Sequence, residues 1–164
     1  MIATRIELLQ QMPIFGGITE EALEYLLQSA PLVEVEAGRY FFHEGDTALG
    51  MYVLESGQVS VSKSWQHCEL LLRQLASGDC FGEMGLLDLY PRSASVRADI
   101  DCRAIELSSA NLYRMFERDA TQFALIQMNI AREMSRRLRH TDDQLFRARM
   151  GEALEAPRPV IRKD

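Results

Sequence analysis

The spacing of hydrophobic residues changes twice along this chain. In residues 4–12 and 19–30, apolar side chains recur three and four positions apart, which predicts two short amphipathic helices. From residue 32 to residue 107, apolar and polar positions alternate in short runs separated by glycine-containing turns, as expected for strands. Strands repeated about every 8–12 residues are typical of a small antiparallel barrel or jelly roll. The expected fold class is therefore α+β and mainly β, with an eight-stranded antiparallel β-roll flanked by helices.

Helical spacing returns near Ala120 and continues to Met150. A helix of this length would be roughly 45 Å long, which is more typical of a two-chain coiled coil than of a helix packed on a small barrel. We therefore expect a homodimer through this long C-terminal helix. The residues expected along its seam are Phe123, Ile126, Ile130, Met134, Leu138, Thr141, Leu145 and Ala148.

The same segment is rich in arginine, which raises the question of nucleic-acid binding. The residues concerned are Arg132, Arg136, Arg137 and Arg139. Glu133 can pair with Arg137 one helical turn later, and Asp142 and Asp143 follow closely. We therefore expect a solvated face with paired charges.

The pattern divides the chain into four segments of one domain. We expect an N-terminal helical segment at residues 1–31, the β-roll at 32–107, a hinge with the long helix at 108–150, and a flexible tail at 151–164. A chain of 164 residues is long enough for one domain with a hydrophobic core and too short for two of ordinary size.

Composition and charge exclude several classes of function. The formal net charge of −6 at pH 7 argues against a general nucleic-acid coat. No apolar run approaches the roughly 20 residues of a membrane-spanning helix, and the first residues lack the layout of a signal peptide, so we expect a cytoplasmic protein without membrane contact. The sequence contains no recognisable nucleophile–base pair and no metal-ligand spacing. We therefore expect that the protein is not an enzyme and has no metal site. The three cysteines are expected to be packed thiols, with Cys80 the one open to redox chemistry.

The stretch with the most informative chemistry covers residues 81–98 and reads FGEMGLLDLYPRSASVRA. Gly82 would let the backbone approach a ligand closely. Arg92 supplies a planar cation that suits two phosphate oxygens, and Ser93 can donate to a further one. Glu83 can accept a hydrogen bond from a ribose hydroxyl. The combination predicts a pocket for a phosphate and a sugar, and the alternative is a hairpin with a buried Arg92–Glu83 pair and an empty pocket.

The order Phe-Gly-Glu, an apolar turn, then Pro-Arg-Ser-Ala and Ser-Val-Arg-Ala resembles the phosphate-binding cassette of cyclic-nucleotide-binding domains. That family includes protein kinase A regulatory subunits, nucleotide-gated channels and catabolite-activator-type bacterial regulators. The resemblance covers about residues 10–145 and implies a cyclic nucleotide as the ligand. A helical turn beginning near Gly85 would add backbone N–H groups to the phosphate site. The cassette residues expected to contact the ligand are Gly82, Glu83, Met84, Gly85, Leu86, Arg92, Ser93 and Ala94.

The resemblance extends to the long helix, where MSRRLRHTDDQL is similar to the dimer helix of catabolite-activator-type regulators. There a Thr-Ser pair reads the adenine 6-amino group, and the serine comes from the partner subunit. Thr141 takes the threonine position, and Asp142 replaces the serine. A carboxylate accepts from the adenine 6-amino group, so we expect cAMP as the ligand. The same carboxylate could reach the 2-amino group of guanine, which keeps cGMP as the alternative.

Apolar strand residues near the cassette are candidates for the wall around the sugar or base. They are Val53, Leu72 and Val96, and each could equally be ordinary core.

The end of the chain bears on how a signal would leave the protein. A helix-turn-helix reader needs on the order of 60 residues beyond the long helix, whereas 14 follow Met150. We expect no direct DNA binding by this chain, but a stand-alone receptor that changes the surface shown to an unidentified effector protein. The hinge is expected near residues 107–122. The alternatives are the effector domain of a transcription regulator and a ligand-free dimerisation scaffold.

Overall fold

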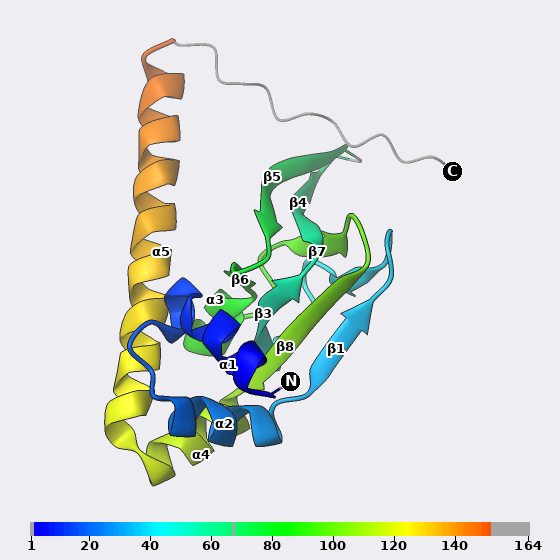
Figure 1. The fold of residues 1–164 in the computed structure, drawn as a ribbon. Helices are drawn as coiled ribbons and strands as arrows, with labels where there is room; N and C mark the ends of the chain where they lie inside the picture. The colour runs from blue at the N-terminus through cyan, green and yellow to red at the C-terminus, as the bar shows by residue number, and fades with distance from the viewer. Residues whose placement is uncertain (1, 67, 152–164) are drawn as a thin grey trace.

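The computed structural model of the chain describes residues 2–66 and 68–151. Figure 1 shows a two-layered β-structure with the N-terminal helices at its lower end and one long helix, α5 (Ala120–Arg149), running the height of the molecule beside it. His67 lies outside the described residues. So do residues 152–164, which make up almost all of the predicted tail.

Eight strands form two four-stranded antiparallel sheets, which confirms the predicted β-roll. One sheet has the strand order β1-β8-β3-β6 and the other has the order β2-β7-β4-β5. Most neighbours in each sheet are not consecutive in sequence, because the chain crosses between the layers as in a jelly roll. The strands are β1 (Leu32–Val35), β2 (Tyr40–Phe42), β3 (Gly50–Ser56), β4 (Gln58–Trp65), β5 (Cys68–Ala76), β6 (Cys80–Phe81), β7 (Ser95–Ala98) and β8 (Cys102–Ser108).

Three of the helices begin at side chains that cap free backbone N–H groups. The side chain of Thr19 accepts from the N–H of Ala22 at the start of α2. Ser108 and Asn111 form a capping box at the start of α4, and Asp119 accepts from two N–H groups of the first turn of α5. The helices are α1 (Ile2–Gln10), the 3-10 helix η1 (Pro13–Phe15), α2 (Glu20–Ser29), α3 (Glu83–Asp88), α4 (Ser109–Arg118) and α5 (Ala120–Arg149).

Two clusters of buried side chains hold the layers together. One fills the space between the two sheets. The other joins the N-terminal helices to the β3–β8 sheet, to α4 and to the first half of α5, where Ile126 and Ile130 are fully buried. The expectation that these two isoleucines belong to a dimer seam is therefore wrong, because they cover the chain's own core.

The second half of α5 has no such packing. Every residue from Leu138 to Gly151 is exposed, including the large apolar side chains of Leu145 and Phe146. This part of the helix rises beside the β4–β5 hairpin in Figure 1. Neither α5 nor any other helix in residues 2–66 and 68–151 combines the length and apolar character required to cross a membrane.

Candidate functional site

Residues 81–98 fold as the end of β6, the short helix α3 and, after an extended segment, β7. Gly82 joins β6 to α3 with φ of 79°, a left-handed value that favours glycine. A Cβ atom at Gly82 would lie 2.6 Å from Nη1 of Arg92, and one at Gly85 would collide with the Cβ of Ala48. The two glycines therefore allow α3 to sit against the arginine on one side and against the loop before β3 on the other.

A cavity of about 500 Å³ opens between this cassette, the strands β4 and β5, and α5. The predicted site residues that line it are Gly82, Glu83, Met84, Gly85, Arg92, Ser93, Ala94 and Thr141. Leu86 lies outside the lining, because its side chain packs against the hydrophobic core. Asp142 is exposed on α5 and also lies outside the lining. Its contact with the base, which the resemblance assigns to the partner chain, stays a prediction.

Arg92 is buried, with 5% of its surface exposed, yet has no carboxylate partner among the described residues. Its Nη1 donates to the carbonyl of Gly82 at 2.9 Å, and its guanidinium lies 4.0 Å from the ring centroid of Phe42. Its Nε is buried without a hydrogen-bond partner. Burial lowers the pKa of Arg92. A buried cation that forms no ion pair with a carboxylate, at a cavity wall, is suited to an anionic ligand.

Glu83 is equally buried, and its partner is Arg137 of α5 instead of Arg92. Its Oε1 accepts from Nη1 of Arg137 at 2.8 Å. The same guanidinium donates to the carbonyl of Cys80 at 2.6 Å and to Oε1 of Glu133 at 2.9 Å. Burial opposes ionisation of Arg137, but the charges of Glu83 and Glu133 outweigh it and raise the pKa of Arg137. The hairpin with a buried Arg92–Glu83 pair is thus not formed, and a buried ion pair ties the cassette to α5.

Arg137 is the functional residue that the sequence analysis placed wrongly. Its side chain is 15% exposed and belongs to the cavity, whereas a solvated position was expected. The predicted pair with Glu133 is confirmed, and it positions the guanidinium on the cavity side. The sequence contained a signal for this position. Arg137 precedes Thr141 by one helical turn, so the two residues share a helix face, and Thr141 was a predicted site residue. The other three arginines of the segment are exposed as expected: Arg132, Arg136 and Arg139.

Two further cations line the cavity and were not predicted, Lys63 on β4 and Arg73 on β5. With Arg92 and Arg137 they make four basic side chains, and the lining contains one carboxylate, that of Glu83. The chain as a whole carries a formal net charge of −6, so this concentration of positive charge is local. The cavity therefore attracts an anion by its own field.

The rest of the lining is largely apolar. Leu72 and Val96 take part in it, as predicted, together with Phe42 and Met134. Val53 does not, because its place on β3 turns it into the core against the helices. A cavity with an apolar wall and a few converging polar groups suits a small ligand with one flat apolar part.

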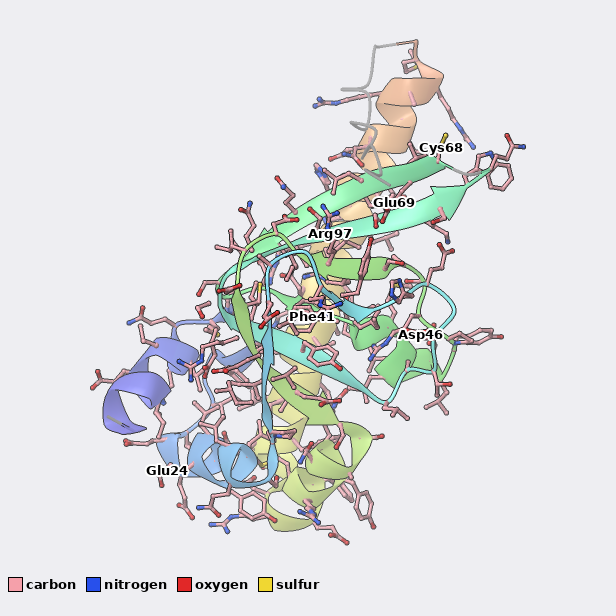
Figure 2. The ribbon with its side chains drawn as sticks, turned by 90° about the vertical axis from the view of Figure 1, so that its right-hand side faces the viewer. Glu24, Phe41, Asp46, Cys68, Glu69 and Arg97 are labelled. Carbon is pink, nitrogen blue, oxygen red and sulfur yellow. The ribbon has the colours of Figure 1, made fainter. Side chains whose placement is uncertain are left out.

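The cysteines do not add redox chemistry to this site. Cys80 is buried, which confirms the expected packed thiol, and burial together with the charge of Glu83 raises its pKa to about 12, which disfavours the reactive thiolate. Cys68 is exposed at the end of the β4–β5 hairpin, as Figure 2 shows, and is not a packed thiol. Within the described part of the chain, no group of three or more His, Cys, Asp or Glu side chains could hold a metal ion.

Comparison with known proteins identifies the family to which this fold and cavity belong. The family model described as "Cyclic nucleotide-binding domain" matches residues 32–119, which is more than half of the chain. The chain belongs to the cyclic nucleotide-binding domain family. The resemblance drawn from the cassette is thereby confirmed.

Individual relatives agree with this assignment. The cyclic AMP receptor protein of Thermus thermophilus is 31% identical over 136 residues, which cover 81% of this chain and 60% of that protein. The crystal structure of the Thermus thermophilus catabolite activator protein matches with a TM-score of 0.72 and 30% identity, over 81% of this chain and 61% of that one. The regulatory domain of Toxoplasma gondii PKA, co-crystallised with cAMP, matches with a TM-score of 0.63 and 26% identity. The match covers 70% of this chain and 44% of that one. The chain spans less than two thirds of the length of the first curated relatives it matches.

Proposed function

We propose that this chain is a receptor for a cyclic purine mononucleotide, bound between the cassette and α5. The observation that carries the proposal is Arg92, a buried guanidinium at the cavity wall without a carboxylate partner and with its Nε unsatisfied. A protein that used Arg92 only for stability would gain by pairing it or replacing it with an apolar residue. The names of the Thermus thermophilus receptor and the Toxoplasma gondii complex favour cAMP as the first ligand to test.

In this proposal each part of the ligand meets a different part of the cavity. The cyclic phosphate lies against Arg92 and Ser93, with Gly82 allowing the approach of the backbone. The ribose 2′-hydroxyl donates to Glu83, which has a second oxygen beyond the one that accepts from Arg137. The base extends toward α5, where Thr141 lines the rim of the cavity.

The signal passes through α5, which shares the cavity with the β-roll. A ligand that contacts both α5 and the β-roll binds more tightly to the arrangement in which the two are close together. This difference in affinity shifts the population toward that arrangement. The hinge is proposed near residues 107–122, where α4 ends and Asp119 caps α5. We propose the segments 1–31, 32–107, 108–150 and 151–164 as parts of one regulatory domain that acts on an effector protein, without catalysis and without direct DNA binding.

A homodimer is proposed through the exposed half of α5. Leu138, Leu145 and Phe146 are 62%, 50% and 65% exposed in the single chain, and a second copy of the helix would cover them. Sedimentation equilibrium should give twice the chain mass for the wild type. It should give the monomer mass for Leu145→Glu, with Gln144→Glu as the control for the added charge. A wild-type monomer at micromolar concentration would refute the dimer.

Calorimetric titration with cAMP and cGMP tests the receptor proposal directly. We expect at least one of them to bind the wild type, and Arg92→Leu to weaken binding by about tenfold or more, because a charge-assisted hydrogen bond contributes roughly 1.5–3 kcal/mol. Arg97→Leu is the matched control: Arg97 lies on β7 in a loose pair with Asp99 at 3.8 Å and does not line the cavity (Figure 2). Failure of a folded wild type to bind either nucleotide at high micromolar concentration would refute the proposal.

A further inference from the structure

The sulfur of Met84 accepts a hydrogen bond from a hydroxyl that the proposed function assigns to the phosphate. Met84 is the second residue of α3, and it lines the cavity while 45% of its surface is exposed. Ser93 also lines the cavity, and its Oγ donates to Sδ of Met84 at 3.7 Å. A thioether is a weak acceptor, so a charged phosphate oxygen easily takes this hydroxyl from it. Ser93 is therefore held in a contact that an anion can replace.

Met84 combines exposure with a place at the ligand site, and the other methionines of the described residues do not. Met128 and Met150 are as exposed as Met84 or more, but neither lines the cavity. Met134 lines the cavity, but it is partly buried and packs against the hydrophobic core. The remaining three are buried in that core: Met12, Met51 and Met115. A reagent that attacks accessible methionine therefore reaches the ligand site first at Met84.

Hydrogen peroxide is such a reagent, and it converts methionine into the sulfoxide. A lone pair of the sulfur attacks one peroxide oxygen, so that an S–O bond forms and the O–O bond breaks. The hydroxide that leaves takes the proton of the transferred oxygen and becomes water. Sulfur is oxidised by two electrons, and the peroxide is reduced by the same two. An apolar side chain thereby becomes a polar one.

The sulfoxide oxygen of Met84 would compete with the ligand for Ser93. The hydroxyl already donates to the sulfur, so an oxygen added there meets a donor that is in place. The cavity lining contains four basic side chains and one carboxylate, and this positive field favours the negative end of the S–O dipole. We infer that Met84 is a site of reversible oxidation by peroxide, and that its sulfoxide lowers the affinity of the receptor for a cyclic nucleotide. This inference rests on the proposed function.

The same competition acts in reverse when the nucleotide is bound first. A phosphate that takes the Ser93 hydroxyl covers the sulfur of Met84 and keeps peroxide away from it. With cAMP at ten times its dissociation constant, roughly one chain in eleven is free, so the oxidation rate of Met84 should fall about tenfold. The rates of Met128 and Met150 should not change. Peptide mass spectrometry of samples taken at intervals measures all three rates in one protein.

Calorimetric titration of the full chain with cAMP, before and after peroxide treatment, tests the effect on affinity. All proteins carry Cys68→Ser, because Cys68 is an exposed thiol that peroxide would also oxidise. We expect the oxidised protein to bind cAMP about tenfold or more weakly, because the phosphate loses a charge-assisted hydrogen bond. Methionine sulfoxide reductases for both sulfoxide epimers should restore the affinity, with dithiothreitol supplying the two electrons and the oxygen leaving as water.

Three variants identify the residue and the mechanism. Met84→Leu has no sulfur at this position, so its affinity, whatever its value, should be the same before and after treatment. Met128→Leu is the matched control and should lose affinity on oxidation as the parent protein does. Ser93→Ala lacks the hydroxyl, so oxidation of Met84 should change its affinity by less than about twofold.

Four outcomes would overturn the inference, and they are distinguishable. Unchanged affinity after mass spectrometry has shown the sulfoxide at Met84 refutes it while the receptor proposal stands. An undiminished loss in Met84→Leu assigns the effect to another residue. An undiminished loss in Ser93→Ala shows that the sulfoxide obstructs the ligand without capturing the hydroxyl. Failure of the untreated protein to bind cAMP or cGMP refutes the receptor proposal and this inference with it. Circular dichroism spectra that match the wild type establish that each protein is folded.

Discussion

Replacing Arg92 and Arg137 in turn by methionine should affect the stability of the ligand-free protein to very different extents. Arg92 is buried and the side chain of Arg137 is 15% exposed at the same cavity, but their surroundings differ. Arg92→Met removes one hydrogen bond from a charged donor, worth roughly 1.5–3 kcal/mol, and one stacking contact with Phe42, worth roughly 0.5–2 kcal/mol. It also removes a buried charge that forms no ion pair, whose desolvation costs several kcal/mol.

These opposing contributions predict that Arg92→Met changes the free energy of unfolding by no more than about 1 kcal/mol, or raises it. Arg137→Met instead leaves Glu83, which is 5% exposed, without its cation. Breaking a buried pair in this way costs about 3–5 kcal/mol.

Urea unfolding followed by far-ultraviolet circular dichroism, at one fixed protein concentration, measures both effects. With a slope of roughly 1–3 kcal/mol per molar urea, a loss of about 3 kcal/mol in Arg137→Met lowers the midpoint by about 1–3 M. The midpoint of Arg92→Met should stay near that of the wild type. Nucleotide at about a hundred times the wild-type dissociation constant should add roughly 2.7 kcal/mol to the wild type, and at most about 1.4 kcal/mol to an Arg92→Met variant that binds tenfold or more weakly. An Arg92→Met variant as unstable as Arg137→Met would show that Arg92 is a structural residue, and would remove the main support for the receptor.

Three further predictions concern single positions. Gly82→Ala should weaken nucleotide binding by about tenfold or more in calorimetry, because its Cβ would lie 2.6 Å from Nη1 of Arg92; unchanged affinity would contradict this. Leu89→Gly should raise the urea midpoint slightly, since Leu89 is 85% exposed and has φ of 61°, a conformation that costs other residues about 1 kcal/mol; a lower midpoint would count against it. A thiol reagent at pH 8 should modify Cys68 but reach Cys80, with its pKa of about 12, only after unfolding, as peptide mass spectrometry would show.

The β-roll and the cassette could be predicted because their information is local. Alternation and glycine turns determine the strands, and Gly82 and Arg92 belong to one short stretch whose residues contact each other. The cap at Ser108 is local in the same sense, since its partner Asn111 is three residues away. Features of this kind are visible in a single sequence.

The α5 side of the cavity could not be predicted in the same way. Helical spacing shows that Arg137 and Thr141 share a face, but only the packing of α5 on the rest of the chain decides what this face meets. The sequence pattern of α5 suggested one continuous apolar seam. Residues packed in the chain's own core and residues on an exposed apolar surface recur at the same helical spacing, so the pattern does not separate them. The place of Arg73 depends on a bulge at Leu72 of β5, which alters the direction of a side chain without leaving a mark in the hydrophobic pattern.

The ion pair between Glu83 and Arg137 gives the proposed receptor a route from ligand to helix. Glu83 belongs to the cassette, and Arg137 ties α5 to it through this carboxylate and the carbonyl of Cys80. Glu133, one turn earlier on α5, accepts from the same guanidinium and helps to orient it. A ribose hydroxyl that donates to Glu83 competes for the same charge, so ligand binding and the strength with which α5 is held become coupled. Coupling of this kind is reciprocal, and values of about 1–3 kcal/mol correspond to changes of roughly 5- to 150-fold in affinity. If dimer formation fixes α5 in one position, it changes the affinity for the nucleotide by some factor. The nucleotide must then change the affinity between the two subunits by the same factor.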